Sequence, residues 1–411
     1  MDKFILAIDA GTTSSRAILF NKKAEILDIA QYEFNQIFPK EGWVEHDPVE
    51  IWNTQLKAIR EVIQKSKIDP KDIDSIGITN QRETTVIWNK DTGQPVYNAI
   101  VWQDRRTAIF CDKLKEDNKS ELIQNKTGLV IDAYFSATKI KWILDSNSDI
   151  REQANKGQLF FGTIDSWLIW NLSKGKYHIT DPSNASRTLL YNIKDDIWDD
   201  QLLEIFDVPR IILPKVVDSS ALSAYTDEEI LGSKIPIAGI AGDQQAALFG
   251  QLCVNPGDVK NTYGTGCFCI MNTGISSVKS KNKMLSTIAW RINGELTYAL
   301  EGSVFVAGAL IQWLRDKMKF FSNAKDSESF LNGDGNSKNV HFLPAFNGLG
   351  APYWNSDIRA SYHGITRDTS KADMINAAFN SITYQTKDII HCLSKIQIEL
   401  KSLNVDGGML T

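Results

Sequence analysis

Two short segments, about 250 residues apart, share one pattern: an apolar strand, a turn rich in glycine and threonine, and a returning strand. In the first, Phe4–Ile8 leads through D-A-G-T-T-S into Arg16–Phe20. In the second, Val259–Thr262 leads through Y-G-T-G into Cys267–Met271. Such repeats predict two domains that open in the same way. Coincidence between two short glycine turns is the alternative.

The residues after the first unit alternate strand and helix signals. Ala24–Ile29 and Ile73–Thr79 are predicted strands. Between them, Asp47 is expected to cap a helix that begins at Pro48. Its apolar face is expected at spacings of four, three and four residues, on Trp52, Leu56, Ile59 and Ile63. Strands mixed with amphipathic helices indicate an α/β protein.

The length of 411 residues also favours two domains. We place the boundary near Gly250, which gives domains of residues 1–250 and 251–411. The net charge of −5 argues against nucleic acid as a partner, and no apolar run is long enough to span a membrane. Five irregularly spaced cysteines are typical of reduced thiols in a cytoplasmic protein. The polar stretch 322–339 is expected to form a mobile surface loop.

The first glycine turn, D-A-G-T-T-S-S-R, has the groups that suit phosphate oxygens. It combines backbone N–H groups, the hydroxyls of Thr12, Thr13 and Ser14, and the guanidinium of Arg16. Asp9 ends the preceding strand and could hold Mg²⁺ through water ligands. The alternative is a hairpin turn with polar residues for solubility. No P-loop or dinucleotide-binding fingerprint occurs in the sequence.

A second candidate site lies in I-A-G-D-Q-Q at 240–245. Gly242 allows a sharp turn, and Asp243 is expected in the first turn of the following helix, beside Gln244. A carboxylate there could accept a proton from a substrate hydroxyl, as the aspartate base of phosphoryl transfer does. The alternative is simple helix capping.

A third group could read a small polyol. Arg82 offers only donors and Glu83 only acceptors, and each polyol hydroxyl needs both. Two surface charges are the alternative. Trp102, Tyr134 and Phe268 could form an apolar wall against the C–H face of the polyol, although aromatic residues are usually core.

The ordered set of motifs resembles the glycerol kinases of the FGGY carbohydrate kinase family over essentially the whole chain. The motifs include D-A-G-T-T-S-S-R, G-I-T-N-Q-R-E-T-T, N-A-I-V-W-Q, D-P-S-N-A-S-R-T, G-I-A-G-D-Q-Q-A-A-L-F-G-Q and N-T-Y-G-T-G-C-F. The resemblance implies an α/β fold of the actin-like, ribonuclease H-like ATPase class. It has two related domains on mixed β-sheets and a nucleotide cleft between them.

The resemblance also implies transfer of the ATP γ-phosphoryl group to glycerol with Mg²⁺, in glycerol uptake and catabolism. Asp243 would be the catalytic base. The implied glycerol site is Arg82, Glu83, Trp102, Tyr134, Asp243, Gln244 and Phe268. The implied ATP/ADP site is Thr12, Thr13, Ser14, Arg16, Thr265, Gly308, Gln312 and Gly408. Asp9 and Asp243 would hold the metal. A homodimer or homotetramer is the implied assembly.

The sequence departs from the family pattern in two places. Residues 225–234 are acidic and hold no histidine, so we expect neither fructose 1,6-bisphosphate control nor histidine phosphorylation. The chain also stops just after Gly408, where family members continue into an asparagine that holds the adenine. We therefore expect a C-terminally truncated second domain, weak ATP binding and slow or absent turnover. A kinase for another polyol or sugar, and a non-catalytic nucleotide binder, are the alternatives.

Overall fold

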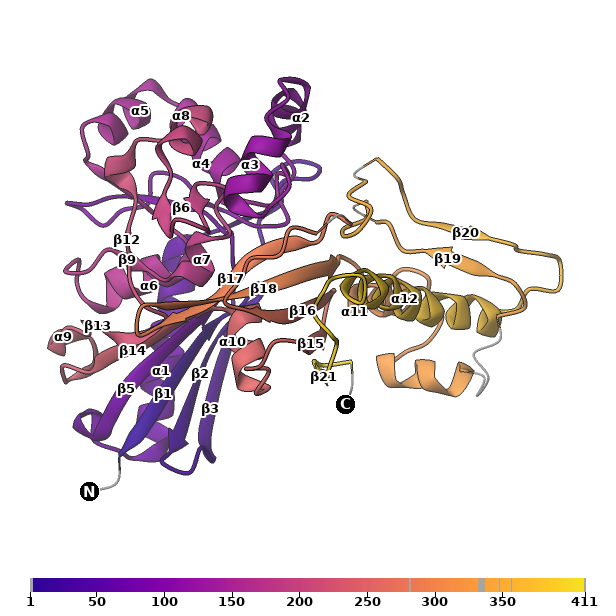
Figure 1. Cartoon of the computed structure of the whole chain (residues 1–411). Helices are drawn as coiled ribbons and strands as arrows, with labels where there is room; N and C mark the ends of the chain where they lie inside the picture. Colours follow the sequence, from indigo (N-terminus) through magenta and orange to yellow (C-terminus); the bar gives the residue numbers. More distant parts are fainter. Residues whose placement is uncertain (1–2, 281, 332–336, 347, 356, 410–411) are drawn as a thin grey trace. The chain divides into compact units, whose positions relative to one another are not determined.

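The computed structural model describes residues 3–280, 282–331, 337–346, 348–355 and 357–409. The chain divides into two compact units (Figure 1). Unit 1 comprises Met1–Ala246 together with Thr287–Thr297, and unit 2 comprises Ala247–Ser286 together with Tyr298–Thr411.

Unit 1 is built on a mixed sheet with the strand order β13-β14-β5-β1-β2-β3. The first strand, β1, pairs antiparallel with β2 and parallel with β5, which in turn pairs parallel with β14. The strands of this sheet are β1 (Phe4–Ala10), β2 (Ser14–Asn21), β3 (Ile26–Glu33), β5 (Ile73–Asn80), β13 (Ser220–Tyr225) and β14 (Pro236–Gly242). All the predicted strands of this region are present, with ends shifted by a few residues.

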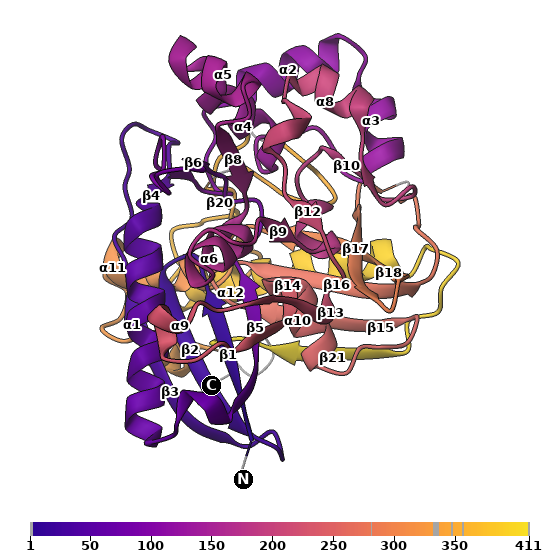
Figure 2. The same cartoon turned by 90° about the vertical axis from the view of Figure 1, so that its left-hand side faces the viewer.

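Helix α1 (Pro48–Ser66) packs along this sheet, as Figure 2 shows. It begins as the sequence predicts, because the Asp47 side chain accepts from Val49 N and Pro48 occupies the first turn. The predicted buried face is rotated, however. Trp52, Leu56 and Ile63 lie on its flank and are only partly buried. The centre of the face is Ile51, Gln55, Ala58, Ile59 and Val62. The large flanking side chains dominate a hydrophobicity pattern, whereas the fully buried positions include the small Ala58 and the polar Gln55.

The remaining elements of unit 1 surround this core. Its other strands are β4 (Glu45–His46), β6 (Val86–Asn89), β7 (Ala99–Ile100), β8 (Leu159–Gly162), β9 (Ile179–Thr180), β10 (Tyr191–Asn192), β11 (Ile197–Trp198) and β12 (Lys215–Val216). Its other helices are η1 (Pro70–Asp72), α2 (Ala108–Glu116), α3 (Ser120–Thr127), α4 (Ser136–Asp145), α5 (Ser148–Asn155), α6 (Ile164–Leu172), α7 (Pro182–Ala185), α8 (Asp200–Phe206), η2 (Arg210–Ile212) and α9 (Glu228–Leu231).

Unit 2 repeats the topology of the unit 1 sheet in the order β21-β15-β16-β18. Here β15 pairs antiparallel with β16 and parallel with β21, just as β1 pairs with β2 and β5. Its strands are β15 (Asp258–Tyr263), β16 (Cys267–Gly274), β18 (Glu295–Val304) and β21 (Ser402–Asp406), with the short pair β19 (His341–Leu343) and β20 (Ser361–His363). The predicted relation between the two strand–turn–strand segments is therefore confirmed.

Helices pack against the unit 2 sheet through a second apolar core, which includes Leu300, Leu310, Ile375 and Leu393. The long helix α12 contacts β16, β19 and α11. These helices are α11 (Gly308–Asp316), η3 (Ala324–Phe330) and α12 (Lys371–Leu393). Helix α10 (Asp243–Gly250) and strand β17 (Leu285–Ile292) each begin in one unit and end in the other.

The structure refines three local features. The apolar strand β1 is buried on one face only, because Leu6 and Ile8 face the core while Ile5 is 46% exposed. Asp9 lies near the end of β1, which continues to Ala10. The stretch 322–339, predicted to be a loop, contains η3, and its residues 332–336 lie outside the described residues.

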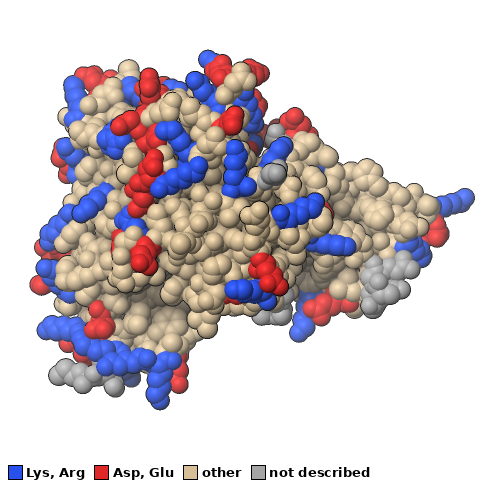
Figure 3. Space-filling view, viewed as in Figure 1, with Lys and Arg blue, Asp and Glu red and all other residues tan. Residues whose placement is uncertain are grey.

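Within the described residues, no helix has both the length and the apolar character needed to cross a membrane. On the face drawn in Figure 3, acidic and basic side chains are interspersed. That face therefore presents no continuous basic field.

Candidate active site

Three strands of unit 1 deliver candidate residues to one edge of the sheet. Strand β5 pairs parallel with both β1 and β14, and Ala10, Asn80 and Gly242 lie at the same level of the sheet. The carboxyl ends of parallel strands meet at the same edge, which is where ligands bind in open α/β sheets. Asp9, Arg82 and Asp243 therefore gather there, although 234 residues separate Asp9 from Asp243.

Arg82 is buried and contacts the first residues of α10. Its Nε lies 3.2 Å from Asp243 Oδ1, and its Nη1 donates to Gln245 Oε1 at 3.2 Å. Gly242 makes this approach possible, since a Cβ there would lie 2.7 Å from the Arg82 side chain. The Asp243 side chain keeps 36% of its surface exposed. It is a carboxylate at a helix start, held by a buried guanidinium and partly exposed to solvent.

Glu83 points to a different partner. Its backbone has φ +60°, a left-handed conformation that is rare outside glycine. Its carboxylate Oε1 accepts from Arg187 Nε at 2.6 Å, and its backbone oxygen accepts from Ser136 Oγ. Arg82 and Glu83 are 3% and 1% exposed, so they are not surface charges.

Two of the three predicted wall aromatics pack together. The rings of Trp102 and Tyr134 meet edge to face with their centroids 5.6 Å apart. Trp102 Nε1 also donates to Thr12 Oγ1 at 3.0 Å. A continuous path of contacts thus connects Asp243 to the first glycine turn, through Arg82, Glu83, Arg187, Tyr134, Trp102 and Thr12. Phe268 lies in β16 of unit 2.

The first glycine turn is short and firmly supported. Gly11 N donates to Ser14 O at 2.9 Å, and the oxygens of Gly11 and Thr12 accept from the side chains of Gln81 and Gln36. Ser14 Oγ accepts from Gln31 Nε2, and Gln31 Oε1 accepts from Arg16 Nε. Thr13 is exposed. Side chains from neighbouring segments therefore hold the turn, and Thr13 is its exposed residue.

Asp9 faces Arg16 across the β1–β2 pair. Burial raises the pKa of the Asp9 carboxyl, and the charge of Arg16 opposes that rise. No group of three or more metal-ligating side chains occurs in the described part of the chain. Two carboxylates, Asp9 and Asp243, do reach the same sheet edge, and such a sparse set suits a cation like Mg²⁺ that keeps most of its water ligands.

In unit 2, the second glycine turn is held by the start of α11. Thr265 O accepts from the backbone N–H groups of Ala307 and Ala309, and Gly264 O accepts from Gly308 N at 2.9 Å. A Cβ on Gly308 would lie 2.7 Å from Gly264 O, so only glycine permits this approach. Gln312 is exposed one turn further along α11.

The segment after β21 joins the same region of unit 2. Met409 N donates to Tyr263 O at 3.2 Å, and Met409 Sδ would lie 3.4 Å from a Cβ on Gly308. Gly407 has φ +109°, whereas a Cβ on Gly408 would meet no atom within 4 Å. Unit 2 therefore brings Thr265, Gly308 and the segment that carries Gly408 into one region, with open space at Gly408.

Sequence reasoning missed Arg187 and Lys139. Arg187 lies in D-P-S-N-A-S-R-T, which the resemblance singles out without a role. Lys139 is fully buried and donates to the backbone oxygens of Tyr134 and Phe135. A buried arginine or lysine gives no periodic signal, so only the structure reveals these contacts.

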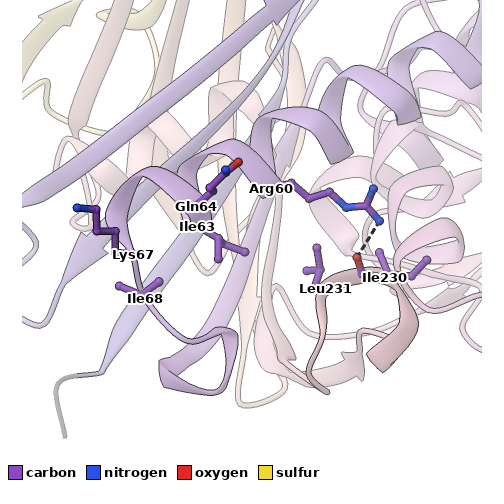
Figure 4. A pocket seen from close by; sticks show the side chains of 7 residues that line it. All are labelled: Arg60, Ile63, Gln64, Lys67, Ile68, Ile230 and Leu231. Carbon is purple, nitrogen blue, oxygen red and sulfur yellow. Dashed lines mark hydrogen bonds between the residues drawn. The ribbon is translucent and has the colours of Figure 1, made fainter.

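A surface pocket elsewhere in unit 1 is lined by none of the predicted catalytic, substrate-binding, nucleotide-binding or metal-binding residues. It lies between the end of α1 and α9, and Arg60 Nη2 there donates to Ile230 O at 3.1 Å (Figure 4). Its lining residues are Arg60, Ile63, Gln64, Lys67, Ile68, Ile230 and Leu231.

Comparison with known proteins gives a consistent result. Residues 4–250 match the N-terminal domain and residues 259–411 the C-terminal domain of the FGGY family of carbohydrate kinases. The chain is 56% identical over 410 residues to a glycerol kinase of Alkaliphilus oremlandii, covering 99% of this chain and 81% of that protein. It is 55% identical over 407 residues to glycerol kinase 2 of Thermotoga maritima, covering 99% and 82%.

Solved structures agree. The crystal structure of Plasmodium falciparum glycerol kinase with ADP superposes with a TM-score of 0.90 at 37% identity, covering 100% of this chain and 82% of that one. A gluconate kinase from Lactobacillus acidophilus gives a TM-score of 0.88 at 23% identity, with coverage of 100% and 82%, and supports the fold alone.

Proposed function

The chain belongs to the FGGY family of carbohydrate kinases, and on that premise we propose that it phosphorylates glycerol. In the proposed reaction, the γ-phosphoryl group of ATP passes to glycerol and gives sn-glycerol 3-phosphate and ADP. The observation that carries the proposal is the path of contacts at the unit 1 sheet edge, which runs from Asp243 through Arg82 to Trp102 and Thr12. It combines an open carboxylate, buried charged groups and an aromatic wall.

Glycerol would be held by paired donors and acceptors. Arg82 and Gln244 supply N–H donors, Glu83 and Asp243 supply acceptors, and the phenol of Tyr134 can do both. Trp102, with Phe268 from unit 2, would cover the C–H face. A site that pairs each hydroxyl rejects analogues that lack one, because a buried polar group is then left unpaired.

Asp243 would accept the proton of the attacking hydroxyl. It suits this role because it is a carboxylate at a helix start, partly exposed, and oriented by Arg82 at 3.2 Å. The ion pair with Arg82 fixes the direction of the carboxylate. In phosphoryl transfer, alignment matters more than base strength.

The nucleotide phosphates would meet Thr12, Thr13, Ser14 and Arg16 of unit 1. The rest of the nucleotide would meet Thr265, Gly308, Gln312 and Gly408 of unit 2. Asp9 and Asp243 would hold Mg²⁺, which neutralises charge on the transferring phosphoryl group when it is bound. We place the reaction in the cytoplasm, in glycerol uptake and catabolism, and propose a homodimer or homotetramer.

A coupled ADP-release assay tests the proposal. We expect kcat/KM for glycerol to exceed that for xylulose or gluconate by roughly 100-fold or more. Faster turnover of either sugar compound would assign the chain to another substrate of the same family. If no substrate releases ADP, the non-catalytic alternative holds.

A further inference from the structure

The segment Asp181–Arg187, which includes α7, lies directly behind the candidate site. Ser183 Oγ accepts from Gly242 N at 2.9 Å, just before Asp243. The side-chain amides of Asn184 and Asn80 exchange hydrogen bonds of 3.0 and 3.2 Å, just before the Arg82 loop. Arg187 Nε donates to Glu83 Oε1 at 2.6 Å. This buried segment therefore forms hydrogen bonds at the ends of β5 and β14, where the chain continues into proposed glycerol-binding residues.

Arg187 makes the most specific of these ties. Its side chain is fully buried, and Glu83 is 1% exposed. Its guanidinium carbon also lies 5.7 Å from the ring centroid of Tyr134 and 5.4 Å from that of Phe135. Arg187 therefore contacts two proposed glycerol-binding residues, Glu83 and Tyr134.

The surroundings contain further charges. Lys139 Nζ donates to the backbone oxygens of Tyr134 and Phe135, and its charge interacts with Glu83, Asp104 and Asp132. Burial lowers the pKa of Lys139 to about 8. A buried carboxylate keeps its charge when paired and hydrogen-bonded, and breaking such a pair is strongly unfavourable. Arg187 is the hydrogen-bonded partner of Glu83.

We propose that Arg187 is a positioning residue that determines specificity for glycerol, because it fixes the Glu83 carboxylate as an acceptor and aligns the ring of Tyr134. This inference rests on the proposed function. Its physical basis is geometric, since a guanidinium supplies a planar, fixed set of donors and stacks on aromatic rings. A lysine ammonium does neither.

The first test compares Arg187→Lys with the wild-type chain. We expect the KM for glycerol to rise roughly 5- to 150-fold, the range for a misplaced buried hydrogen-bonding group. The KM for ATP should change less than twofold. The preference for glycerol over 1,2-propanediol, measured as a ratio of kcat/KM values, should fall, because the site would no longer require each hydroxyl.

Arg291→Lys is a matched control in the same unit. Arg291 forms ion pairs with Asp196 and Asp218 and contacts none of the proposed glycerol residues. We expect it to lower the thermal midpoint without changing the KM for glycerol or the substrate preference. A purely structural role of Arg187 would give the same result as this control, and that outcome would overturn the proposal.

A second comparison, of Glu83→Gln with the double variant, keeps the test decisive if Arg187→Met alone does not fold. Glu83→Gln with Arg187→Met removes both charges of this buried pair, so the double variant should fold better than Arg187→Met. If Arg187 acts through Glu83, adding Arg187→Met to Glu83→Gln should change the glycerol KM less than twofold. A clearly higher glycerol KM in the double variant than in Glu83→Gln would contradict the proposal.

The proposed function and the proposed role of Arg187 can be disproved independently. If the wild-type chain does not phosphorylate glycerol but accepts another polyol, the proposed function is wrong, and the same variants are compared on that polyol. If the wild-type chain phosphorylates glycerol and Arg187→Lys leaves both its KM and its preference unchanged, only the role of Arg187 is wrong.

Discussion

At the scale of single residues, the proposed role of Asp243 as the catalytic base can be tested directly by substitution. Asp243→Asn keeps the shape and a hydrogen-bond acceptor for Arg82 Nε but removes the negative charge. We expect kcat to fall about 10²- to 10⁴-fold, the usual contribution of a general base. The thermal midpoint should stay close to that of the wild type. Retained turnover would remove Asp243 as the base.

The two neighbouring glycines after β21 should behave differently. A Cβ on Gly408 meets nothing within 4 Å, so Gly408→Ala should fold normally and raise the KM for ATP if the nucleotide approaches that backbone. Gly407 has φ +109°, and a Cβ there would lie 2.3 Å from Tyr263 O. Gly407→Ala should therefore destabilise the chain by about 1–3 kcal/mol.

Urea unfolding and ATP kinetics on both variants separate these effects. Equal loss of stability in the two variants would show that Gly408 is constrained by packing, contrary to its open surroundings. An unchanged KM for ATP in Gly408→Ala would remove this glycine from the nucleotide site.

The sequence predicted which residue types form the candidate site, but it did not predict which side chains they contact. The sequence identified Arg82 and Glu83 as a donor and an acceptor beside a strand. It could not reveal that they pair with Asp243 and Arg187, because Glu83 turns away through a positive φ and Arg187 lies 104 positions further along the chain. Side-chain direction at a strained backbone position is set by tertiary packing.

At the scale of elements, the β1–β2 turn depends on a neutral histidine. His46 Nε2 lies 2.8 Å from Gln36 Oε1, and its Nδ1 lies 3.4 Å from Gln81 Nε2. The same two glutamines donate to the oxygens of Thr12 and Gly11. A neutral ring that donates from Nε2 and accepts at Nδ1 fits this arrangement. Protonation of His46 at Nδ1 would place its N–H against the N–H donor of the Gln81 side-chain amide.

Acid should therefore weaken this element. Burial lowers the pKa of His46 from 6.5 to about 4. The stability that neutral His46 contributes is fully present above pH 6.5 and is lost as the pH falls through about 4. A shift of this size corresponds to about 3 kcal/mol at most.

Urea midpoints of the wild type and His46→Gln at pH 7 and pH 4.5 measure this effect. We expect the advantage of the wild type to shrink at the lower pH. His178 lies elsewhere in unit 1, and burial also lowers its pKa to about 4, so His178→Gln should show the same dependence on pH. An advantage of the wild type over His46→Gln that is independent of pH would contradict the role of His46.

The elements themselves were predictable to different degrees. Asp47 and Pro48 marked the start of α1 correctly, because capping depends on residues that are adjacent in sequence. The buried face was misjudged, because a sheet accepts Ala58 and Gln55 at its closest approach and pushes Trp52 to the flank. Gln55 is buried because its side chain donates to Arg16 O at 2.9 Å, a contact across 39 positions.

At the scale of the whole molecule, five buried cysteines report on the two units separately. Cys111 lies in unit 1, and Cys253, Cys267, Cys269 and Cys392 lie in unit 2. Burial raises the pKa of Cys111, Cys267 and Cys269 to about 12, so these thiols should resist alkylation in the native state.

We expect unit 2 to open at the lower urea concentration. Strand β21 lies at one end of the described sheet, and its Leu403 and Val405 are 43% and 45% exposed, so few apolar contacts hold this edge. Peptide mass spectrometry after iodoacetamide labelling at increasing urea should detect unit 2 cysteines first. Earlier labelling of Cys111 would reverse this order of stability.

The repeated architecture was the most predictable property at this scale. Two strand–turn–strand segments indicated two related domains, and the shared order of β5-β1-β2 and β21-β15-β16 bears this out. The path of the chain between the units was not predictable. Residues Thr287–Thr297 belong to unit 1 although both flanking stretches belong to unit 2. Arg291 pairs with Asp218, its backbone oxygen accepts from Ser219 N, and its backbone N–H donates to Ser219 Oγ.

Because residues Thr287–Thr297 return to unit 1, the protein cannot be divided into its units by a single cut. The chain passes from one unit to the other three times, so neither unit is a single continuous stretch of coding sequence. A proteolytic nick near residue 250 would leave the second fragment carrying a hairpin that completes the first. Such fragments should behave as partners in complementation, and separate expression of unit 1 would need residues 287–297 grafted onto it or supplied in trans.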